Sequence, residues 1–187
     1  MKLILLPTFA ALLTLGVMQT GSAQATDEAF LKFEPAVEGE SKVVRHLNEI
    51  ELVGFRSNLT RAGLPGITVP SGKPKFGPLK VYKYIDKASV PLMVACAAAT
   101  KYKTATVTVF STPQIGVPYD SMKIVLSDVF VSGVDGGNEA TDGEGNLLET
   151  VMLSYSKIEW SYVPLDSRGA PLPTIKGGWD LTKGVKL

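Results

Sequence analysis

The sequence has few of the residue types that usually carry chemistry. It contains one cysteine, Cys96, and one histidine, His46, among 187 residues. A single thiol excludes an intrachain disulfide, so burial within the domain, or against copies of itself, must hold it together. The sequence also lacks G-x-S-x-G, H-E-x-x-H, paired Cys/His metal ligands, G-x-G-x-x-G and a phosphate-binding loop. We therefore expect no catalytic residues, no cofactor and no enzymatic activity.

An excess of charge of one sign is also missing. The chain has 19 Lys and Arg against 18 Asp and Glu. The first 25 residues contain Lys2 and no acid, so without them each total is 18 and the net charge is 0. A neutral protein produces no long-range field that would attract nucleic acid or anionic lipid. We expect neither as a partner of the processed chain.

Long hydrophobic runs are confined to the N-terminus. Lys2 precedes an apolar run that ends at Met18, and Ala23-Gln24-Ala25 has the small–x–small form of a signal peptidase site. The run is shorter than the ~20 residues of a membrane span. This pattern predicts a signal peptide over 1–25, cleaved near Ala25, and one secreted or periplasmic domain over 26–187. Met18 is an alternative start that would remove most of the run.

The remaining sequence is mostly of β type. Runs rich in β-branched and aromatic residues alternate with clusters of Gly, Pro, Asp and Asn. The pattern predicts about seven antiparallel strands that form a barrel or sandwich. The expected strands are 29–34, 47–59, 79–85, 104–110, 121–134, 149–163 and 177–183.

One segment, 89–99, favours a helix. Ser89 is expected to cap it, and Pro91 falls in the first turn, where its missing N–H costs nothing. Helical spacing then places four residues on one apolar face, namely Leu92, Met93, Cys96 and Ala99. Cys96 is therefore predicted to be a buried structural thiol. Such a helix is suited to covering an open end or side of a barrel.

Two strands carry apolar residues on both faces. In 121–134, one face has Met122, Ile124, Leu126 and Phe130, and the other has Val125, Val129 and Val131. In 149–163 the apolar positions change from odd, ending at Tyr155, to even, beginning at Ile158, which requires a bulge or a new environment. Strands of this kind are usually covered on both sides, which indicates self-association. The interface candidates are Val125, Val129, Val131, Trp160 and Tyr162.

Two loops are candidate sites. Segment 61–78 is rich in Pro and Gly, and a loop this long is usually functional or disordered. Segment 135–146 is acidic, and Asp142, Glu144 and Asn146 alternate as calcium ligands do. Because the EF-hand positions for Gly and Glu are not matched, a solvated hairpin loop is favoured and calcium is the weaker alternative. His46 lies between charged neighbours, which does not favour catalysis.

The order of these pieces resembles the haemolysin-coregulated protein (Hcp) family, the tube proteins of type VI secretion systems. The string D-K-x-S-x-x-L-x-x-x-C between two strands, and its order relative to G-W-D, are the most specific features. The resemblance covers nearly the whole chain from Phe30 onward. The segments that carry it are FLKFEPAVEGESK (30–42), HLNEIELVGF (46–55), GKPKFGPLKVYKYIDKASVPLMVAC (72–96), MKIVLSDVFVSGV (122–134), ETVMLSYSKIEWSY (149–162) and GGWDLTKG (177–184).

The resemblance implies a two-sheet β-barrel with one flanking helix. It also implies that six copies close into a ring and that rings stack head to tail into a tube. A contractile sheath, a spike protein and effectors held in the ring lumen are the implied partners. The family's ring-stacking loop corresponds by position to 61–78, so Leu64, Ile67, Val69 and Phe76 are the implied stacking residues.

One departure from the family leaves two functions open. Tube proteins of this family usually have no signal peptide, because they leave the cell through the secretion machine. The chain is either a tube subunit with an unusual export route or start codon, or an exported β-barrel binding module of the same ancestry. An enzyme would instead require a polar cluster around His46 inside a cleft.

Overall fold

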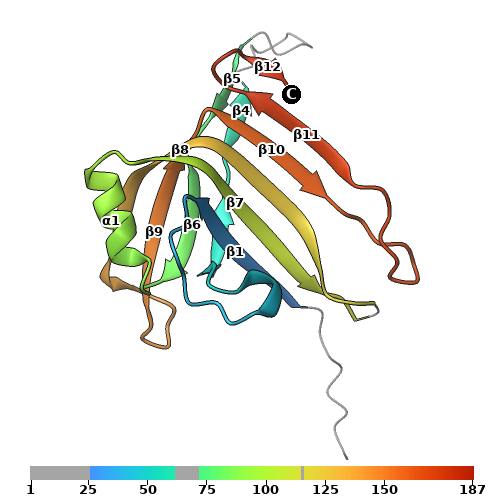
Figure 1. Ribbon diagram of the computed structural model, residues 1–187, viewed down its shortest axis with the longest axis horizontal. Helices are drawn as coiled ribbons and strands as arrows, with labels where there is room; N and C mark the ends of the chain where they lie inside the picture. The colour runs from blue at the N-terminus through green and yellow to red at the C-terminus, as the bar shows by residue number, and fades with distance from the viewer. Residues whose placement is uncertain (1–25, 62–71, 115) are drawn as a thin grey trace, which may run out of the picture.

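A computed structural model describes residues 26–61, 72–114 and 116–187. The signal peptide expected over 1–25 and the stacking residues Leu64, Ile67 and Val69 lie outside these ranges. The described chain is mainly β with one α-helix, as the sequence predicts (Figure 1). Its elements are β1 (Thr26–Glu34), a 3-10 helix η1 (Val44–His46), β2 (Ile50–Leu52), β3 (Gly54–Arg56), β4 (Leu59–Arg61), β5 (Pro74–Phe76), β6 (Leu79–Tyr84), α1 (Ser89–Ala97), β7 (Lys101–Thr112), β8 (Tyr119–Thr141), β9 (Leu147–Ser154), β10 (Lys157–Tyr162), β11 (Ile175–Asp180) and β12 (Val185–Lys186).

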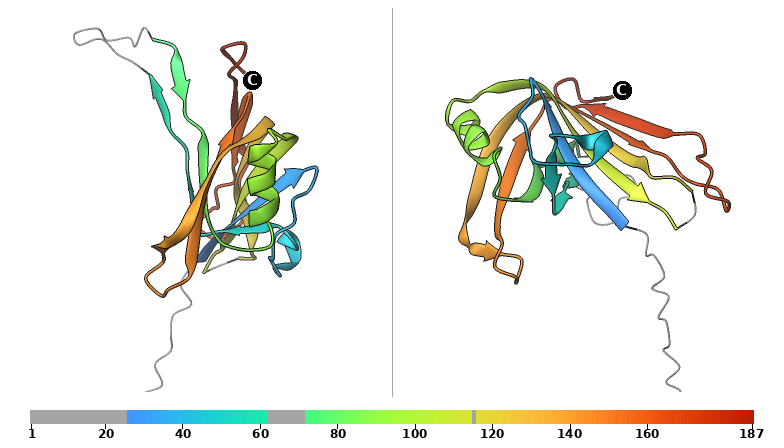
Figure 2. Two further views of the ribbon diagram at one scale, coloured as in Figure 1. Left: turned by 90° about the vertical axis from the view of Figure 1, so that its left-hand side faces the viewer. Right: turned by 60° about the horizontal axis from the view of Figure 1, so that its bottom comes forward.

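The long strand β8 joins two layers of antiparallel strands. The first half of β8 belongs to a layer with the strand order β12-β11-β10-β8-β7-β1-β2. Its second half belongs to the other layer, in which β8 pairs with β9, β9 with β6, and β6 with β3. Figures 1 and 2 show β8 curving from one layer to the other, with β10 and β11 on one side and β9 and α1 on the other. The two-sheet antiparallel architecture expected from the sequence is confirmed.

The two layers meet again where β2 is followed by β3. β2 pairs with β1, whereas β3 pairs with β6, and only Val53 separates the two short strands. The Val53 N–H donates to the carbonyl oxygen of Tyr82 on β6 at 2.8 Å. The layers therefore enclose one apolar core between them. Its buried members include Leu31, Phe33, Val81, Val107, Leu126, Val151 and Ile158.

A backbone irregularity at Asp128 corrects the assignment of faces along β8. Asp128 has φ 54°, a left-handed value that is uncommon for residues other than Gly. Beyond it, Val129 and Val131 join the same buried core as Leu126, while Phe130 turns outward and is 37% exposed. The sequence pattern assigns Leu126 and Val129 to opposite faces of this strand. Because the irregularity at Asp128 shifts the alternation by one residue, both side chains point into the same core.

The neighbouring strand changes phase at the same place. The run expected as one strand over 149–163 is two strands, β9 and β10, with a break at Tyr155 and Ser156. The Ser156 hydroxyl donates to Asp128 Oδ2 at 2.7 Å, and its backbone N–H donates to Ser127 O at 2.9 Å. Lys101 Nζ lies 2.7 Å from Asp128 Oδ1. These contacts join the irregularity at Asp128 to the break at Ser156, at the point where β8 passes from the first layer to the second.

Helix α1 covers the β8–β9 side but differs from its expected pattern. It ends at Ala97, because Ala99 adopts a left-handed φ of 50° and the Thr100 N–H donates to Ala95 O. Ser89 is its first helical residue rather than its cap, and the N-cap position falls on Ala88, which forms no side-chain cap. The buried face consists of Ala88, Ser89, Leu92 and Ala95, Cys96 is partly buried against the core, and Met93 and Ala99 are exposed. No helix in the described ranges is long and apolar enough to cross a membrane.

Candidate functional site

An apolar row crosses five strands at the open end of the first layer. Cross-strand partners share a face of a sheet, and the registers place Ala29, Val109, Met122, Tyr162 and Ile175 in one line from β1 to β11. The row lies on the core-facing side, but exposure rises along it to 49% at Tyr162 and 63% at Ile175. We call these five residues the open-end row. The core surface therefore continues onto β10 and β11 without cover from the described chain.

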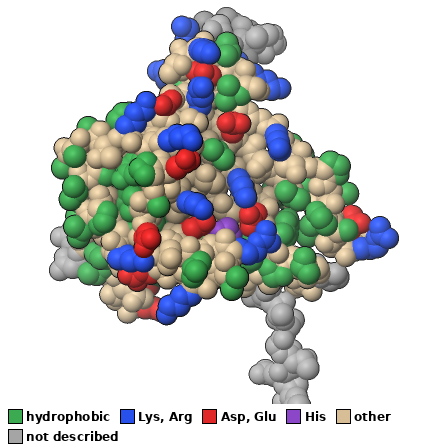
Figure 3. Space-filling model, viewed as in Figure 1, with side chains coloured by type: hydrophobic (Ala, Val, Ile, Leu, Met, Phe, Trp, Pro, Cys, Tyr) green, Lys and Arg blue, Asp and Glu red, His purple; other side chains and the backbone are tan. Residues whose placement is uncertain are grey.

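A cluster of aromatic residues lies at the base of the β4–β5 ribbon. The ring of Phe76 is 6.4 Å from each of the Trp160 and Trp179 rings, with interplanar angles of 23° and 26°. These three side chains, together with Leu59, Thr60, Arg61 and Pro74, line a pocket of about 330 Å³. The stacking candidate Phe76 and the interface candidate Trp160 thus belong to one surface. Figure 3 shows hydrophobic side chains gathered on the flanks formed by β10–β11 and by α1.

The predicted interface residues separate into three groups. Tyr162 and Trp160 lie on the same face of β10: Tyr162 is exposed, whereas Trp160 is half-buried against the core and the Phe76 ring. Val125 is partly buried on the opposite face and lines a shallow pocket with Glu159 and Gly178. Val129 and Val131 are 0% and 3% exposed in the core, so their interpretation as interface residues is wrong. The change of phase at Asp128 is the reason.

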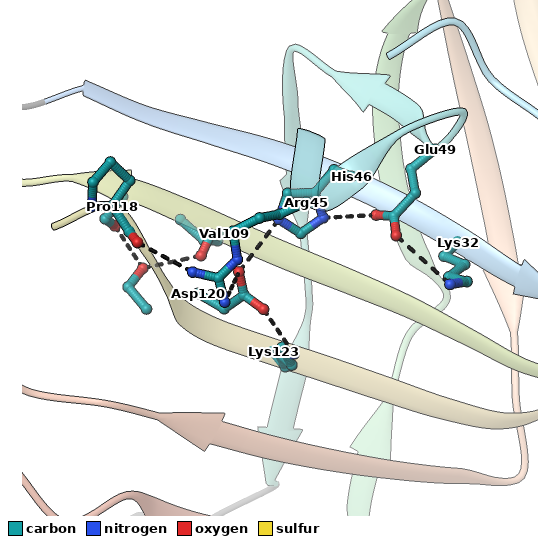
Figure 4. Close-up of polar contacts among 10 residues, drawn as sticks. Lys32, Arg45, His46, Glu49, Val109, Pro118, Asp120 and Lys123 are labelled. Atoms are coloured by element: carbon teal, nitrogen blue, oxygen red, sulfur yellow. Dashed lines mark hydrogen bonds and ion pairs between the residues drawn. The ribbon is translucent and has the colours of Figure 1, made fainter. Parts of the chain in front are cut away.

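The one histidine lies between two carboxylates on the outer face of β1 and β7. His46 Nδ1 is 2.9 Å from Glu49 Oε2, and Nε2 is 3.3 Å from Asp120 Oδ1 (Figure 4). Its ring stacks on Phe30, with centroids 4.4 Å apart and planes 7° apart, and meets the Phe110 ring edge-on at 5.2 Å. The side chain is buried but lines none of the pockets described here. This arrangement is a packed polar centre.

Basic side chains surround the two carboxylates. Lys123 Nζ is 2.8 Å from Asp120 Oδ2, Arg45 Nη2 is 3.8 Å from Oδ1, and Lys32 Nζ is 3.9 Å from Glu49 Oε1. Burial raises the pKa of Asp120, but Lys123, Arg45 and His46 outweigh it, and the pKa lies below its ordinary value. Asp120 is therefore ionised at neutral pH. In Figure 3 the histidine is visible as a small area enclosed by acidic and basic groups.

A second polar centre lies beneath α1, and the sequence interpretation missed it. Lys83 on β6 and Glu149 on β9 are direct cross-strand partners and are both almost fully buried. Lys83 Nζ is 2.7 Å from Glu149 Oε1, 2.7 Å from Asp86 Oδ1 and 3.1 Å from Ser89 Oγ. The Ser89 hydroxyl donates to Glu149 Oε1 at 2.9 Å. The alternation of side chains along β6 could have predicted the burial of Lys83, because Lys83 lies on the same face as the core residues Leu79 and Val81.

Comparison with known proteins assigns this fold to a family. The family model described as type VI secretion system effector, Hcp, matches residues 30–162. The chain belongs to the Hcp family. Protein hcp1 of Pseudomonas aeruginosa is 31% identical over 154 residues, which cover 80% of this chain and 93% of that protein. The family assignment made from the sequence is confirmed.

Solved Hcp structures are similar over nearly their whole length. A structure described as a type six secretion system protein has a TM-score of 0.77 and 27% identity, and the match covers 87% of this chain and 100% of that one. Hcp1 from Salmonella typhimurium has a TM-score of 0.69 and 28% identity, over 86% and 99% of the two chains. As an Hcp protein, the chain is a secreted protein of the type VI system, of the tube and effector class.

The acidic loop of this Hcp chain uses its calcium candidates to form a turn. Asp142 Oδ1 accepts from the backbone N–H groups of Glu144 and Asn146, and Oδ2 accepts from Asn146 Nδ2 and Tyr84 Oη. The Asn146 side chain and these other donors lower the pKa of Asp142 to about 2. The structure therefore joins Asp142 to Asn146 by hydrogen bonds that calcium would have to displace. Calcium binding stays a prediction.

Proposed function

We propose that the chain is a structural, ring-forming subunit of the type VI secretion tube. The observation that carries this proposal is the open-end row, an apolar strip that continues the core and ends in the exposed side chains of Tyr162 and Ile175. At about 25 cal/mol per Å² of apolar surface, covering such side chains favours association. In this proposal six copies close the ring, and the rings stack.

The edges of the first layer support head-to-tail contact. β12 pairs only with Trp179 and Asp180, so no described strand pairs with Ile175–Gly177 on that side of β11. At the other edge, β2 pairs only with Ala29–Leu31 of β1, which leaves Thr26–Glu28 without a strand on that side among the described residues. Open edges are sites of pairing with another chain. Two different edges on one protomer suit a heterologous interface, which closes by rotation.

The solution mass of the full processed chain tests the ring. We expect light scattering on a sizing column to give about six protomer masses. Ile175→Asp should lower the mass, because it places a charge in the covered strip, without unfolding the protomer. Val44→Asp is the matched control, since Val44 is 92% exposed on η1. A wild-type protomer mass, or a hexameric and folded Ile175→Asp variant, would contradict this interface.

The export route and the cargo belong to the same proposal. We infer a cleaved signal peptide over 1–25, which mass spectrometry of the secreted protein tests directly by the N-terminal residue. A chain that begins at Thr26 supports cleavage and counts against assembly of a tube in the cytoplasm. A chain that begins at Met18, without cleavage, supports the alternative start and strengthens the tube function. The sheath, the spike protein and lumenal effectors are the proposed partners of the assembled tube.

A second candidate function rests on the aromatic pocket. Ligand sites are mostly apolar, with few polar groups, and have volumes from about 300 Å³ upward. The pocket beside Phe76, Trp160 and Trp179 fits that description. An exported binding module without a ring would keep this pocket and remain a protomer. A protomer mass combined with quenching of tryptophan fluorescence by an apolar ligand would favour this function.

A further inference from the structure

We propose that His46 is a pH-sensitive clamp that holds segment 35–49 against β1, β7 and β8. The clamp consists of His46, Glu49 and Asp120. It is closed when both ring nitrogens of His46 carry a proton, and it loosens when one proton is lost. This conformational property of the protomer goes beyond the proposed tube function and does not depend on it.

The donor and acceptor inventory of the three side chains carries the inference. An ionised carboxylate only accepts hydrogen bonds, whereas a neutral imidazole has one donor and one acceptor nitrogen. His46 has a carboxylate oxygen at each ring nitrogen, at 2.9 Å and 3.3 Å. Only the doubly protonated ring can donate to both. In the neutral ring, one lone pair would face a carboxylate oxygen at that distance, and the ring is too buried for water to replace the lost bond.

Basic groups surround the two carboxylates of the clamp. Lys32 from β1 lies beside Glu49, while Lys123 from β8 and Arg45 from η1 lie beside Asp120. β7 contributes the ring of Phe110, over which the Arg45 guanidinium lies at 5.8 Å. Imidazole is the side chain whose charge ordinarily changes between about pH 5 and 8. The clamp contributes stability at the lower end of that range and loses it as the pH rises.

His46 joins segment 35–49 to β8 through its bond to Asp120, and its bond to Glu49 fixes the ring within the segment. The segment has one 3-10 turn and is otherwise irregular, and its backbone is held by bonds such as Gly39 N–H to Asn48 O and Asn48 N–H to Ser41 O. It covers the ring of Phe30, which His46 stacks upon. Weakening one of the two His46 bonds should therefore increase opening of this segment and leave distant strands unaffected.

Hydrogen exchange of the full chain tests the clamp. The measured quantity is the protection of the Gly39, Ser41 and Asn48 amides, corrected for intrinsic exchange, relative to β9 amides such as Val151. We expect this relative protection to fall by about tenfold between about pH 6 and pH 9, because one charge-assisted hydrogen bond is lost. A relative protection that stays constant over this range would overturn the proposal.

Glu49→Gln supplies the matched control. Its side-chain amide can donate to a neutral imidazole nitrogen or accept from a protonated one, so both states of His46 are satisfied. We expect the variant to lose most of the pH dependence while remaining folded. Asp120→Asn should act in the same way through the other nitrogen and replaces Glu49→Gln if that variant does not fold. A variant that keeps the wild-type pH dependence would overturn the role of the carboxylates.

A second measurement uses the wild-type chain alone. Because His46 is the only histidine, its ring ¹⁵N signals can be assigned without ambiguity. We compare folded and urea-unfolded protein at a pH where the unfolded ring is half protonated, about 6.5. The proposal requires the doubly protonated pattern in the folded chain. The neutral pattern in the folded chain would overturn it.

Discussion

Two polar centres of this protein share one arrangement, a basic side chain held between two carboxylates. Beneath α1, Lys83 lies between Glu149 and Asp86. On the outer face of β1, His46 lies between Glu49 and Asp120. Each centre joins a segment without strand structure to the sheet: the turn into α1 in the first case and segment 35–49 in the second.

The centres differ in the basic side chain and in its surroundings. The Lys83 side chain is 0% exposed and surrounded by core residues, and Glu149 Oε2 has no hydrogen-bond partner in the described chain. The His46 centre lies close to the surface and is surrounded by Lys32, Arg45 and Lys123. A lysine ordinarily stays charged far above neutral pH, whereas a histidine does not. The same arrangement thus gives a permanent link in one place and a pH-dependent one in the other.

The largest expected effect breaks the permanent link. Lys83→Met removes the cation and leaves Glu149 buried without a partner charge, so the free energy of unfolding should fall by about 3–5 kcal/mol. Chemical denaturation at neutral pH measures this change. A loss of less than about 1 kcal/mol would contradict the view that Lys83 neutralises a buried carboxylate.

The double variant Lys83→Met/Glu149→Leu is the control for this prediction. It replaces both charged partners by apolar groups of similar size, which in other proteins is often neutral or stabilising. We expect it to recover most of the stability lost in the single variant. Failure to recover would mean that the bonds to Ser89 and Asp86, rather than the lone charge, dominate the loss.

The next effect is smaller and weakens the same centre from the helix side. The Ser89 hydroxyl donates to Glu149 Oε1 and accepts from the Asp86 N–H at 3.0 Å and from Lys83. Ser89→Ala should cost about 1–2 kcal/mol of unfolding free energy, because these buried partners lose one bond each. Val90→Ala, at a neighbouring position that is 68% exposed, should change stability by less than about 0.5 kcal/mol. Equal losses in the two variants would contradict the buried role of Ser89.

The sequence predicted the β class, the place of the helix and the family, because these depend on patterns that extend over many residues. It did not predict the face of Val129 and Val131, because one left-handed residue, Asp128, changes the phase of all that follow. That conformation is stabilised by Ser156 and Lys101, which are distant in sequence. The alternation of apolar residues in the sequence cannot show where a strand changes phase unless the residues that stabilise the irregularity are already known.

The two polar centres could not be predicted from the sequence either, because their partners are far apart along the chain. The alternation Leu79-Val81-Lys83 placed a lysine on a core face, but its partner Glu149 is 66 residues away. His46 was interpreted from its charged neighbours in sequence, whereas its partner Asp120 comes from β8 and its stacking partner Phe30 from β1. The local sequence did not favour catalysis at His46, but it could not show that tertiary contacts bury the side chain.

The smallest expected effect is the loss of stability from Asp120 when the His46 centre is acidified. Because the folded pKa of Asp120 lies below its ordinary value, its charge contributes stability above that value, and the contribution is lost as the pH falls below about 4. Asp120→Asn should therefore be less stable than wild type near pH 5, by less than about 1 kcal/mol because solvent and salt screen a partly exposed group. The difference should shrink toward pH 2. Glu34→Gln, at an exposed ion pair with Lys103, should show little difference at either pH. Denaturation curves at several pH values measure this, and a difference that grows on acidification would reverse the inferred sign.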